Sequence, residues 1–255
     1  MKILALDTST KFLSLGISDG KKIYECSLEV GVKLSSLLMP TIKRALESAR
    51  MGLGDIDFFA CGLGPGSFTG IRVGIAAVKA LAWSLEKPLV GIPTLDSLAR
   101  GIFLSEQGIA GAADVCHGLR QEDIVIVPVI DAKRKMFYSS VYKLRGRDLK
   151  RVSPYFLLSP QELSVKILSH CGGKKGKVTL FFAGDGVELY RQARAQGPGR
   201  EVVLDKDCWY PRPRHMIALA QEKISSAKVS NAYELKPLYL YPKECQIREI
   251  KEFKK

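Results

Sequence analysis

The chain contains 255 residues, of which 46% are hydrophobic and 25% charged. This composition is that of a globular protein, and it excludes disordered, collagen-like and coiled-coil chains. The formal net charge is +13, and most of the excess lies in residues 104–255. Such an excess favours a polyanionic partner, with nucleic acid first, although an ordinary solvated basic surface explains it equally well.

The localisation follows from what the sequence lacks. No apolar run reaches the ~18 residues of a membrane-spanning helix. Asp7 interrupts the first apolar segment too early for a secretory signal peptide. The cysteines include no Cys-x-x-Cys pair, so reduced thiols are expected. We therefore expect a cytoplasmic protein that contacts no membrane.

The N-terminal part of the chain combines strand patterns with helical ones. Strand-forming runs before Leu28, with a turn signal at Asp19-Gly20, predict three strands. From Leu34 the apolar residues follow a helical period instead. The predicted elements are strands at 2–6, 12–18 and 21–28, a helix at 34–50, a strand at 56–61, a helix at 71–85, a strand at 88–92 and a helix at 94–104.

The second part of the chain repeats the opening of the first. A strand ends at Asp7 and is followed by four turn residues and another strand, and the same order recurs around Asp131. The repeat predicts a duplicated α/β architecture with a mixed sheet in each half. We expect an N-terminal domain at 1–103, an insertion or hinge at 104–122 and a basic C-terminal domain at 123–255. The later predicted elements are strands at 124–130, 136–144 and 154–158, a helix at 159–170, a strand at 178–183, a helix ending near 195 and a helix at 215–226.

A glycine-rich loop at 62–66 lies between a predicted strand and a predicted helix. Glycine permits close backbone approach, and the free N–H groups of a helix N-terminus bind anions, so the loop is a candidate phosphate site. It has neither the Walker A nor the Gly-x-Gly-x-x-Gly spacing, and a tight turn that lets a helix pack closely explains it as well. Asp, Ser and Thr are likewise ordinary turn formers. The candidate nucleotide-binding residues are Asp7, Thr8, Ser9, Gly64, Gly66, Ser67, Gly184, Asp185 and Gly186.

The predicted helix at 71–85 is apolar on nearly every face. A helix of this kind is covered all round in a folded protein. Its glycine and alanine positions suit close contact between helices. The cover is therefore either another layer of this chain or a partner protein.

The sequence contains no recognisable catalytic constellation. The histidines at 117, 170 and 215 lack the spacing of a metal site or a triad. Asp7 and Asp131, which end equivalent strands, form one suggestive carboxylate pair, and turn formation explains both. We expect neither a metal nor a catalytic residue.

Motifs spread over nearly the whole chain carry a family resemblance. They are Ile3–Thr10, Gly64–Gly74, Gly91–Leu98, Asp131–Tyr138, Gly184–Gly186 and Pro237–Leu240. These segments resemble the TsaB (YeaZ) family, bacterial proteins of tRNA threonylcarbamoyladenosine biosynthesis. The resemblance implies a duplicated actin-like (ribonuclease H-like, Hsp70-like) fold. The chain departs from the family at Lys33-Leu-Ser-Ser, where a His-Ser-Glu sequence is common, and in the longer stretch at 104–122.

The resemblance also implies an assembly. TsaB-like proteins pair with a related transferase, TsaD, which transfers threonylcarbamoyl to the adenosine beside the anticodon of tRNAs that read codons beginning with A. An ATPase, TsaE, joins them, so ATP or ADP acts at the level of the assembly. The two N-terminal helices form the contact, which is also a candidate homodimer contact in the free protein. The implied contact residues are Leu34, Leu37, Leu38, Ile42, Ile71, Arg72, Gly74, Ile75, Val78 and Leu81.

These observations predict a non-catalytic scaffold that activates a tRNA-modifying transferase. One alternative is an actin-fold phosphotransferase that uses Asp7 and the loop at Gly64–Gly66 on ATP. Another is a stand-alone RNA-binding module driven by the basic second half. The candidate tRNA-facing residues in that half are Lys133, Arg134, Arg145 and Arg147.

Overall fold

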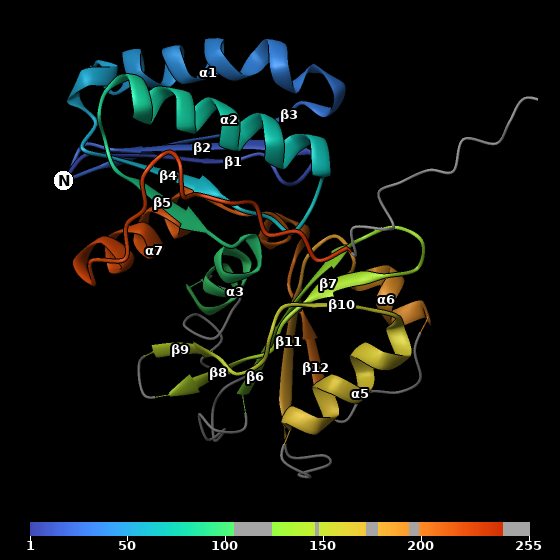
Figure 1. The fold of residues 1–255 in the computed structure, drawn as a ribbon. Helices are drawn as coiled ribbons and strands as arrows, with labels where there is room; N and C mark the ends of the chain where they lie inside the picture. The colour runs from blue at the N-terminus through green and yellow to red at the C-terminus, as the bar shows by residue number, and fades with distance from the viewer. Residues whose placement is uncertain (105–123, 146–147, 172–177, 194–198, 242–255) are drawn as a thin grey trace, which may run out of the picture.

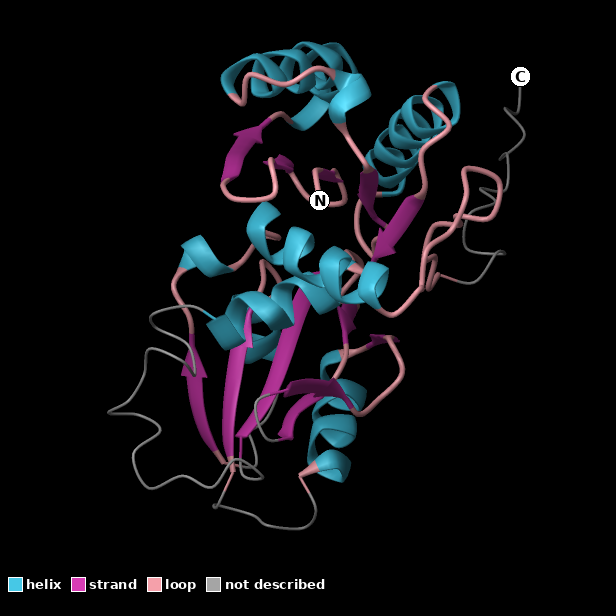
Figure 2. Ribbon diagram, turned by 90° about the vertical axis from the view of Figure 1, so that its left-hand side faces the viewer, coloured by secondary structure: helices cyan, strands magenta, loops and turns pink. Residues whose placement is uncertain are grey.

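The computed structural model describes residues 1–104, 124–145, 148–171, 178–193 and 199–241. Residues 105–122 of the expected insertion, and Arg147, lie outside the described residues. The described chain forms two β-sheets, one beyond the other, with helices on both faces of each (Figures 1 and 2). We call them the N-terminal and the C-terminal sheet.

The N-terminal sheet contains five strands in the order β3-β2-β1-β4-β5. The first three strands form an antiparallel meander, because the Asp19 carboxylate accepts hydrogen bonds from the N–H groups of Lys21 and Lys22 and closes the second turn. β4 and β5 continue the sheet in parallel with β1. The strands are β1 (Ile3–Asp7), β2 (Phe12–Ser18), β3 (Ile23–Glu29), β4 (Phe58–Gly62) and β5 (Leu89–Ile92).

Helices cover this sheet on both faces, which is why every residue of β1 is buried. α1 (Leu34–Ser48) and α2 (Phe68–Ser84) lie on the outer face (Figure 1). α7 (Pro213–Ser225) lies on the inner face, where its Met216 and Ile217 contact a second cluster of strand residues. Short 3-10 helices occupy Gly31–Lys33, Leu53–Asp55 and Lys206–Cys208.

The C-terminal sheet repeats this plan around β6. Its main path is β10-β7-β6-β11-β12, and a hairpin of β8 and β9 pairs with the N-terminal part of β6. α5 and α6 cover one face and α3 the other. The elements are α3 (Thr94–Leu104), β6 (Ile124–Asp131), β7 (Phe137–Ser139), β8 (Tyr142–Arg145), β9 (Asp148–Arg151), β10 (Phe156–Leu158), α5 (Pro160–His170), β11 (Thr179–Ala183), α6 (Val187–Ala193) and β12 (Arg200–Val203).

The two sheets thus confirm the duplicated, actin-like α/β fold that the repeat and the resemblance predicted. The packing, however, crosses the expected division of the chain at two helices. α3 belongs to the N-terminal part of the sequence but packs its Ala99 and Ile102 on the C-terminal sheet. α7 belongs to the C-terminal part but covers the N-terminal sheet. Both helices lie between the sheets, in contact with each other (Figures 1 and 2).

Some predicted boundaries were wrong. The strand expected at 136–144 is two strands, because the buried Ser140 and Val141 leave the ladder and bond to the Ser153 hydroxyl instead. The sequence reasoning also missed the short strands β9 and β12. α2 begins at Phe68 rather than Ile71, with Ser67 as its N-cap.

Within the described ranges, none of the helices combines the length and the apolar character that crossing a membrane would require.

Candidate functional site

Asp7 ends β1 at the point where the two halves of the molecule meet, and its side chain is 2% exposed. Its Oδ1 accepts hydrogen bonds from the backbone N–H of Ser9 (2.7 Å) and from the Ser9 hydroxyl (2.6 Å). Its Oδ2 accepts a hydrogen bond from the Thr94 hydroxyl (2.9 Å). Burial raises the pKa of the Asp7 carboxyl, and these hydrogen bonds offset part of that effect. Both oxygens are therefore engaged by the chain itself.

The glycine-rich loop packs directly onto this turn. A Cβ atom at Gly62 would overlap the Asp7 carboxylate, and one at Gly66 would overlap the Ser9 carbonyl oxygen. The backbone N–H of Ser67 donates to that same carbonyl oxygen (2.7 Å). The absence of side chains therefore lets the loop pack closely against Asp7 and against the backbone of Ser9.

The start of α2 continues the contact. Its Gly70 and Gly74 face Thr8 so closely that a Cβ atom at either would overlap it, and the Thr8 hydroxyl donates to the Gly70 carbonyl oxygen (2.7 Å). Ser67 caps the helix by accepting from the Gly70 N–H (3.2 Å). The structure thus shows that Asp7, Thr8, Ser9, Gly64, Gly66 and Ser67 join a strand end, a loop and a helix, and their role in nucleotide binding stays a prediction.

The candidate residues of the second half form a separate cluster. Asp185 accepts a hydrogen bond from the Asp131 N–H (3.0 Å), and burial raises the pKa of the Asp185 carboxyl. A Cβ atom at Gly184 or Gly186 would overlap backbone of β6. Asp185 lines a cavity of about 620 Å³ together with Lys11 and Tyr210. Neither Asp7 nor the Gly64–Gly66 loop lines this cavity, so the structure does not gather the nine predicted residues in one site.

The expected tRNA-facing residues are also divided. Lys133, Arg134 and Lys135 form an exposed turn after β6, all three with left-handed φ values of 64°, 53° and 59°. Lys133 pairs with Asp131, whereas Arg134 makes no ion pair with any described residue. Arg145 ends β8, which pairs with the opposite end of β6. The structure therefore places Arg145 apart from the turn.

The ten expected partner-contact residues mostly build the core instead of the surface. Arg72 is exposed, and Leu37 and Leu81 are half-buried. The other seven are buried, because the apolar faces of both helices pack on the N-terminal sheet. These seven are Leu34, Leu38, Ile42, Ile71, Gly74, Ile75 and Val78.

Other residues form the outer surface of the two helices. On α2 they include Ala76, Ala80 and Trp83, which follow the helical period, and Trp83 is 64% exposed. On α1, Met39 and Pro40 are exposed. We call these five residues the helical face. The sequence contained one indication of this face, because Ala76 and Ala80 are small residues on the side of α2 opposite its buried residues.

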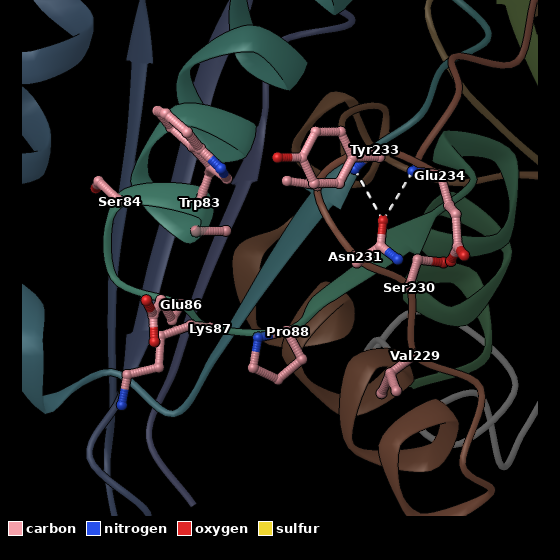
Figure 3. A pocket seen from close by; sticks show the side chains of 12 residues that line it. Trp83, Ser84, Glu86, Lys87, Pro88, Val229, Ser230, Asn231, Tyr233 and Glu234 are labelled. Carbon is pink, nitrogen blue, oxygen red and sulfur yellow. Dashed lines mark hydrogen bonds between the residues drawn. The ribbon is translucent and has the colours of Figure 1, made fainter.

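A groove continues from the helical face at the C-terminal end of α2. Its volume is about 800 Å³. Figure 3 shows Trp83 and Tyr233 on its two sides, with Pro88 and Val229 below them. The Asn231 side chain fixes one wall by accepting from the N–H groups of Tyr233 (2.9 Å) and Glu234 (3.0 Å).

A third cavity, of about 410 Å³, lies between the halves at the N-terminal end of α2. We call it the interdomain pocket. The sequence reasoning missed it, because its walls come from three distant segments. It is lined by Gly66, Phe68, Ile71, Ala132, Arg134, Tyr138, Leu238, Tyr239, Leu240 and Tyr241.

Comparison with known proteins identifies the family of this chain. The family model described as "TsaD: tRNA N6-adenosine threonylcarbamoyltransferase" matches residues 29–244. The chain belongs to this family. Within it, the chain is a TsaB (YeaZ) homologue, as the sequence motifs indicated.

Several named relatives support the similarity to TsaB (YeaZ) proteins. The tRNA threonylcarbamoyladenosine biosynthesis protein TsaB of Bacillus subtilis is 27% identical over the full length of both chains. TsaB of Escherichia coli is 36% identical over 104 residues, which cover 40% of this chain and 45% of that protein. The solved structure of YeaZ from Pseudomonas aeruginosa is 25% identical, with a TM-score of 0.75, and covers 94% of this chain and 100% of that one. TsaB homologues over the whole length connect the chain with tRNA threonylcarbamoyladenosine biosynthesis.

Proposed function

We propose that this chain is a non-catalytic subunit that binds a TsaD-like transferase through the helical face and activates it. The transferase then modifies the adenosine next to the anticodon in tRNAs that read codons beginning with A. A TsaE-like ATPase joins the assembly, so ATP acts at the level of the assembly.

The helical face is the observation that carries this proposal. Ala76 and Ala80 present only methyl groups on the outer side of α2 between Arg72 and Trp83, so a partner helix can approach this stretch closely. Trp83 stands at the end of the same stripe with 64% of its surface exposed, and buried tryptophans are frequent energetic centres of interfaces. The sheet below fixes both helices through a continuous core, so the face is preorganised.

The geometry of Asp7 supports a role without chemistry. A carboxylate that assists phosphoryl transfer must reach a metal ion or a substrate oxygen. Both Asp7 oxygens accept hydrogen bonds from Ser9 and Thr94 instead, and the glycine loop closes the approach. This favours the scaffold over the phosphotransferase.

The test is complex formation with the cognate TsaD-like transferase, measured by size-exclusion chromatography and calorimetry. The wild-type chain is expected to form a complex, and Ala80→Arg is expected to abolish it, because the new side chain prevents close helix contact. Trp83→Ala is expected to weaken binding about tenfold or more, in line with the loss of a hot-spot residue.

A matched control is Ala193→Arg, which adds the same side chain to an exposed alanine of α6 in the other half. It is expected to bind like the wild type. An unchanged affinity of Ala80→Arg, or no complex with the wild-type chain, would refute the proposal. Strong tRNA binding by the isolated chain would favour the RNA-binding alternative.

A further inference from the structure

We propose that the interdomain pocket binds a nucleotide, with its base against the aromatic walls and its phosphate at Arg134. Neither the family nor the proposed scaffold role assigns this pocket. Its volume of about 410 Å³ lies within the range of small-molecule sites.

The first argument is the aromatic lining. Phe68 of α2 and Tyr239 of the C-terminal segment stack with their ring centroids 5.1 Å apart and a tilt of 37°. Both rings are partly open to solvent, with exposed fractions of 40% and 36%. Tyr138 and Tyr241 form a second, edge-to-face pair at 6.0 Å. Exposed rings of this kind are the platforms on which bases stack.

The second argument is that this geometry is fixed before any ligand arrives. Arg72 lies over the Phe68 ring at 3.8 Å, and its Nε donates to the Tyr239 hydroxyl (3.0 Å). On the other side, the Tyr241 hydroxyl donates to the Ala132 carbonyl oxygen (2.9 Å). Preorganised rings lose little conformational entropy on binding.

The third argument is charge. Arg134 lines the pocket, is exposed and makes no ion pair or hydrogen bond with a described residue. No acidic residue is among the lining residues of this pocket. The other two cavities described above differ, because the groove contains Glu86 and Glu234, and the cavity beside Asp185 mixes three acidic with three basic side chains. A flat aromatic group carrying a negative charge fits the interdomain pocket, because its described lining combines four aromatic rings with one arginine and contains no carboxylate.

The remaining hydrogen-bonding capacity fits the same ligand. Tyr138 is 7% exposed, and its hydroxyl makes no hydrogen bond with a described residue. It is therefore free to bond a polar edge of a base. The nucleotide is either free in solution or part of a single-stranded RNA, and the recognition chemistry is the same for both.

The experiment measures binding of AMP by calorimetry and of a fluorescently labelled six-residue oligoadenylate by anisotropy, with the full-length chain. Binding of either ligand is expected, and the better one identifies the source. Tyr239→Ala is expected to lower affinity about tenfold, the loss typical of one stacked base. Tyr239→Phe, which keeps the ring, is expected to restore most of it.

Arg134→Gln is expected to weaken binding and to reduce the salt dependence of oligonucleotide binding by about one phosphate contact. Arg50→Gln is the matched control, because Arg50 is also an exposed arginine with a φ of 53° but lies after α1, away from the pocket. No binding of either ligand, or equal effects of Arg134→Gln and Arg50→Gln, would overturn the proposal. Complex formation with the transferase is measured separately through Ala80→Arg, so the two proposals fail independently.

Discussion

At the scale of single residues, Asp7 holds together a strand end, a turn and a helix start through three accepted hydrogen bonds. Replacing it with alanine leaves buried donors at Ser9 and Thr94 with fewer acceptors. We expect Asp7→Ala to lower the free energy of unfolding by about 1–3 kcal/mol, measured by urea denaturation. Complex formation with the transferase should remain.

The control is Asp57→Ala, because Asp57 also accepts a backbone N–H, that of Lys2, but is exposed. This substitution is expected to lower the free energy of unfolding by less than Asp7→Ala does. If Asp7→Ala instead kept full stability and abolished a nucleotide-dependent turnover of this chain, the structural role of Asp7 would be wrong.

His215 gives a pH-dependent prediction. It is buried on α7 against Gly101 of α3, and burial lowers its pKa from 6.5 to about 4, with Arg100, Arg212 and Arg214 acting in the same direction and Glu25 opposing them. The unfolded chain therefore binds a proton at this position below pH 6.5 that the folded chain does not bind until about pH 4. Stability is unaffected by this group above pH 7 and falls as the pH drops.

The expected loss from this one group between pH 7 and pH 5 is about 2 kcal/mol. His215→Gln should remove that part of the pH dependence in urea denaturation at the two pH values. If the free energy of unfolding of His215→Gln depended on pH as strongly as that of the wild type, the histidine would be protonated in the folded state.

At the scale of elements, the N-terminus of α2 depends on Ser67. The sequence motif made this residue a candidate nucleotide ligand, and the structure uses its side chain as the helix cap. Ser67→Ala is expected to destabilise the chain by about 1 kcal/mol, and Ser67→Asp, which also caps well, to preserve stability. Thermal or urea unfolding of both variants measures this. Equal losses in the two variants would contradict the capping role.

The same scale shows what a sequence pattern can and cannot predict. The strand at Phe12–Ser18 and the helix from Leu34 were predictable, because their periods and turn residues are strong. The helical period also selected Leu34, Leu38 and Ile42 correctly as one face. It could not tell that this face is covered by the chain's own sheet.

The strand β9 and the interdomain pocket were not predicted, for a different reason. β9 reads Asp-Leu-Lys-Arg and is mostly exposed, so it has no apolar alternation that a pattern could detect. The interdomain pocket was beyond reach, because Phe68, Tyr138 and Tyr239 meet only through the tertiary fold. Neither is encoded in local spacing.

At the scale of the whole molecule, the exchange of α3 and α7 joins the two halves. Each helix covers the sheet of the other half, and they meet through His215 against Gly101 and an ion pair between Arg100 and Glu222. The C-terminal segment adds a further tie, because Ser230 pairs with Leu89 at the edge of β5. An amphipathic pattern shows that a helix is covered on one face but not by which sheet, so this arrangement was not predictable.

The exchange also separates the surfaces of the molecule. The helical face is on the outer side of the N-terminal sheet, whereas the interdomain pocket and the basic turn are at the junction of the halves. The two proposals therefore assign partner binding and contact with an anionic ligand to different residues. The net charge of +13 adds a long-range attraction for polyanions without fixing where they bind.

The most direct test of the scaffold role is reconstituted threonylcarbamoylation of tRNA by the TsaD-like transferase and the TsaE-like ATPase, with and without this chain. The account predicts strong stimulation by the wild-type chain. It predicts at least a tenfold loss with Ala80→Arg, and near wild-type stimulation with Ala193→Arg and, at saturating concentration, with Asp7→Ala. Full stimulation by Ala80→Arg together with none by folded Asp7→Ala would contradict it, because the chain would then act through Asp7 and not through the helical face.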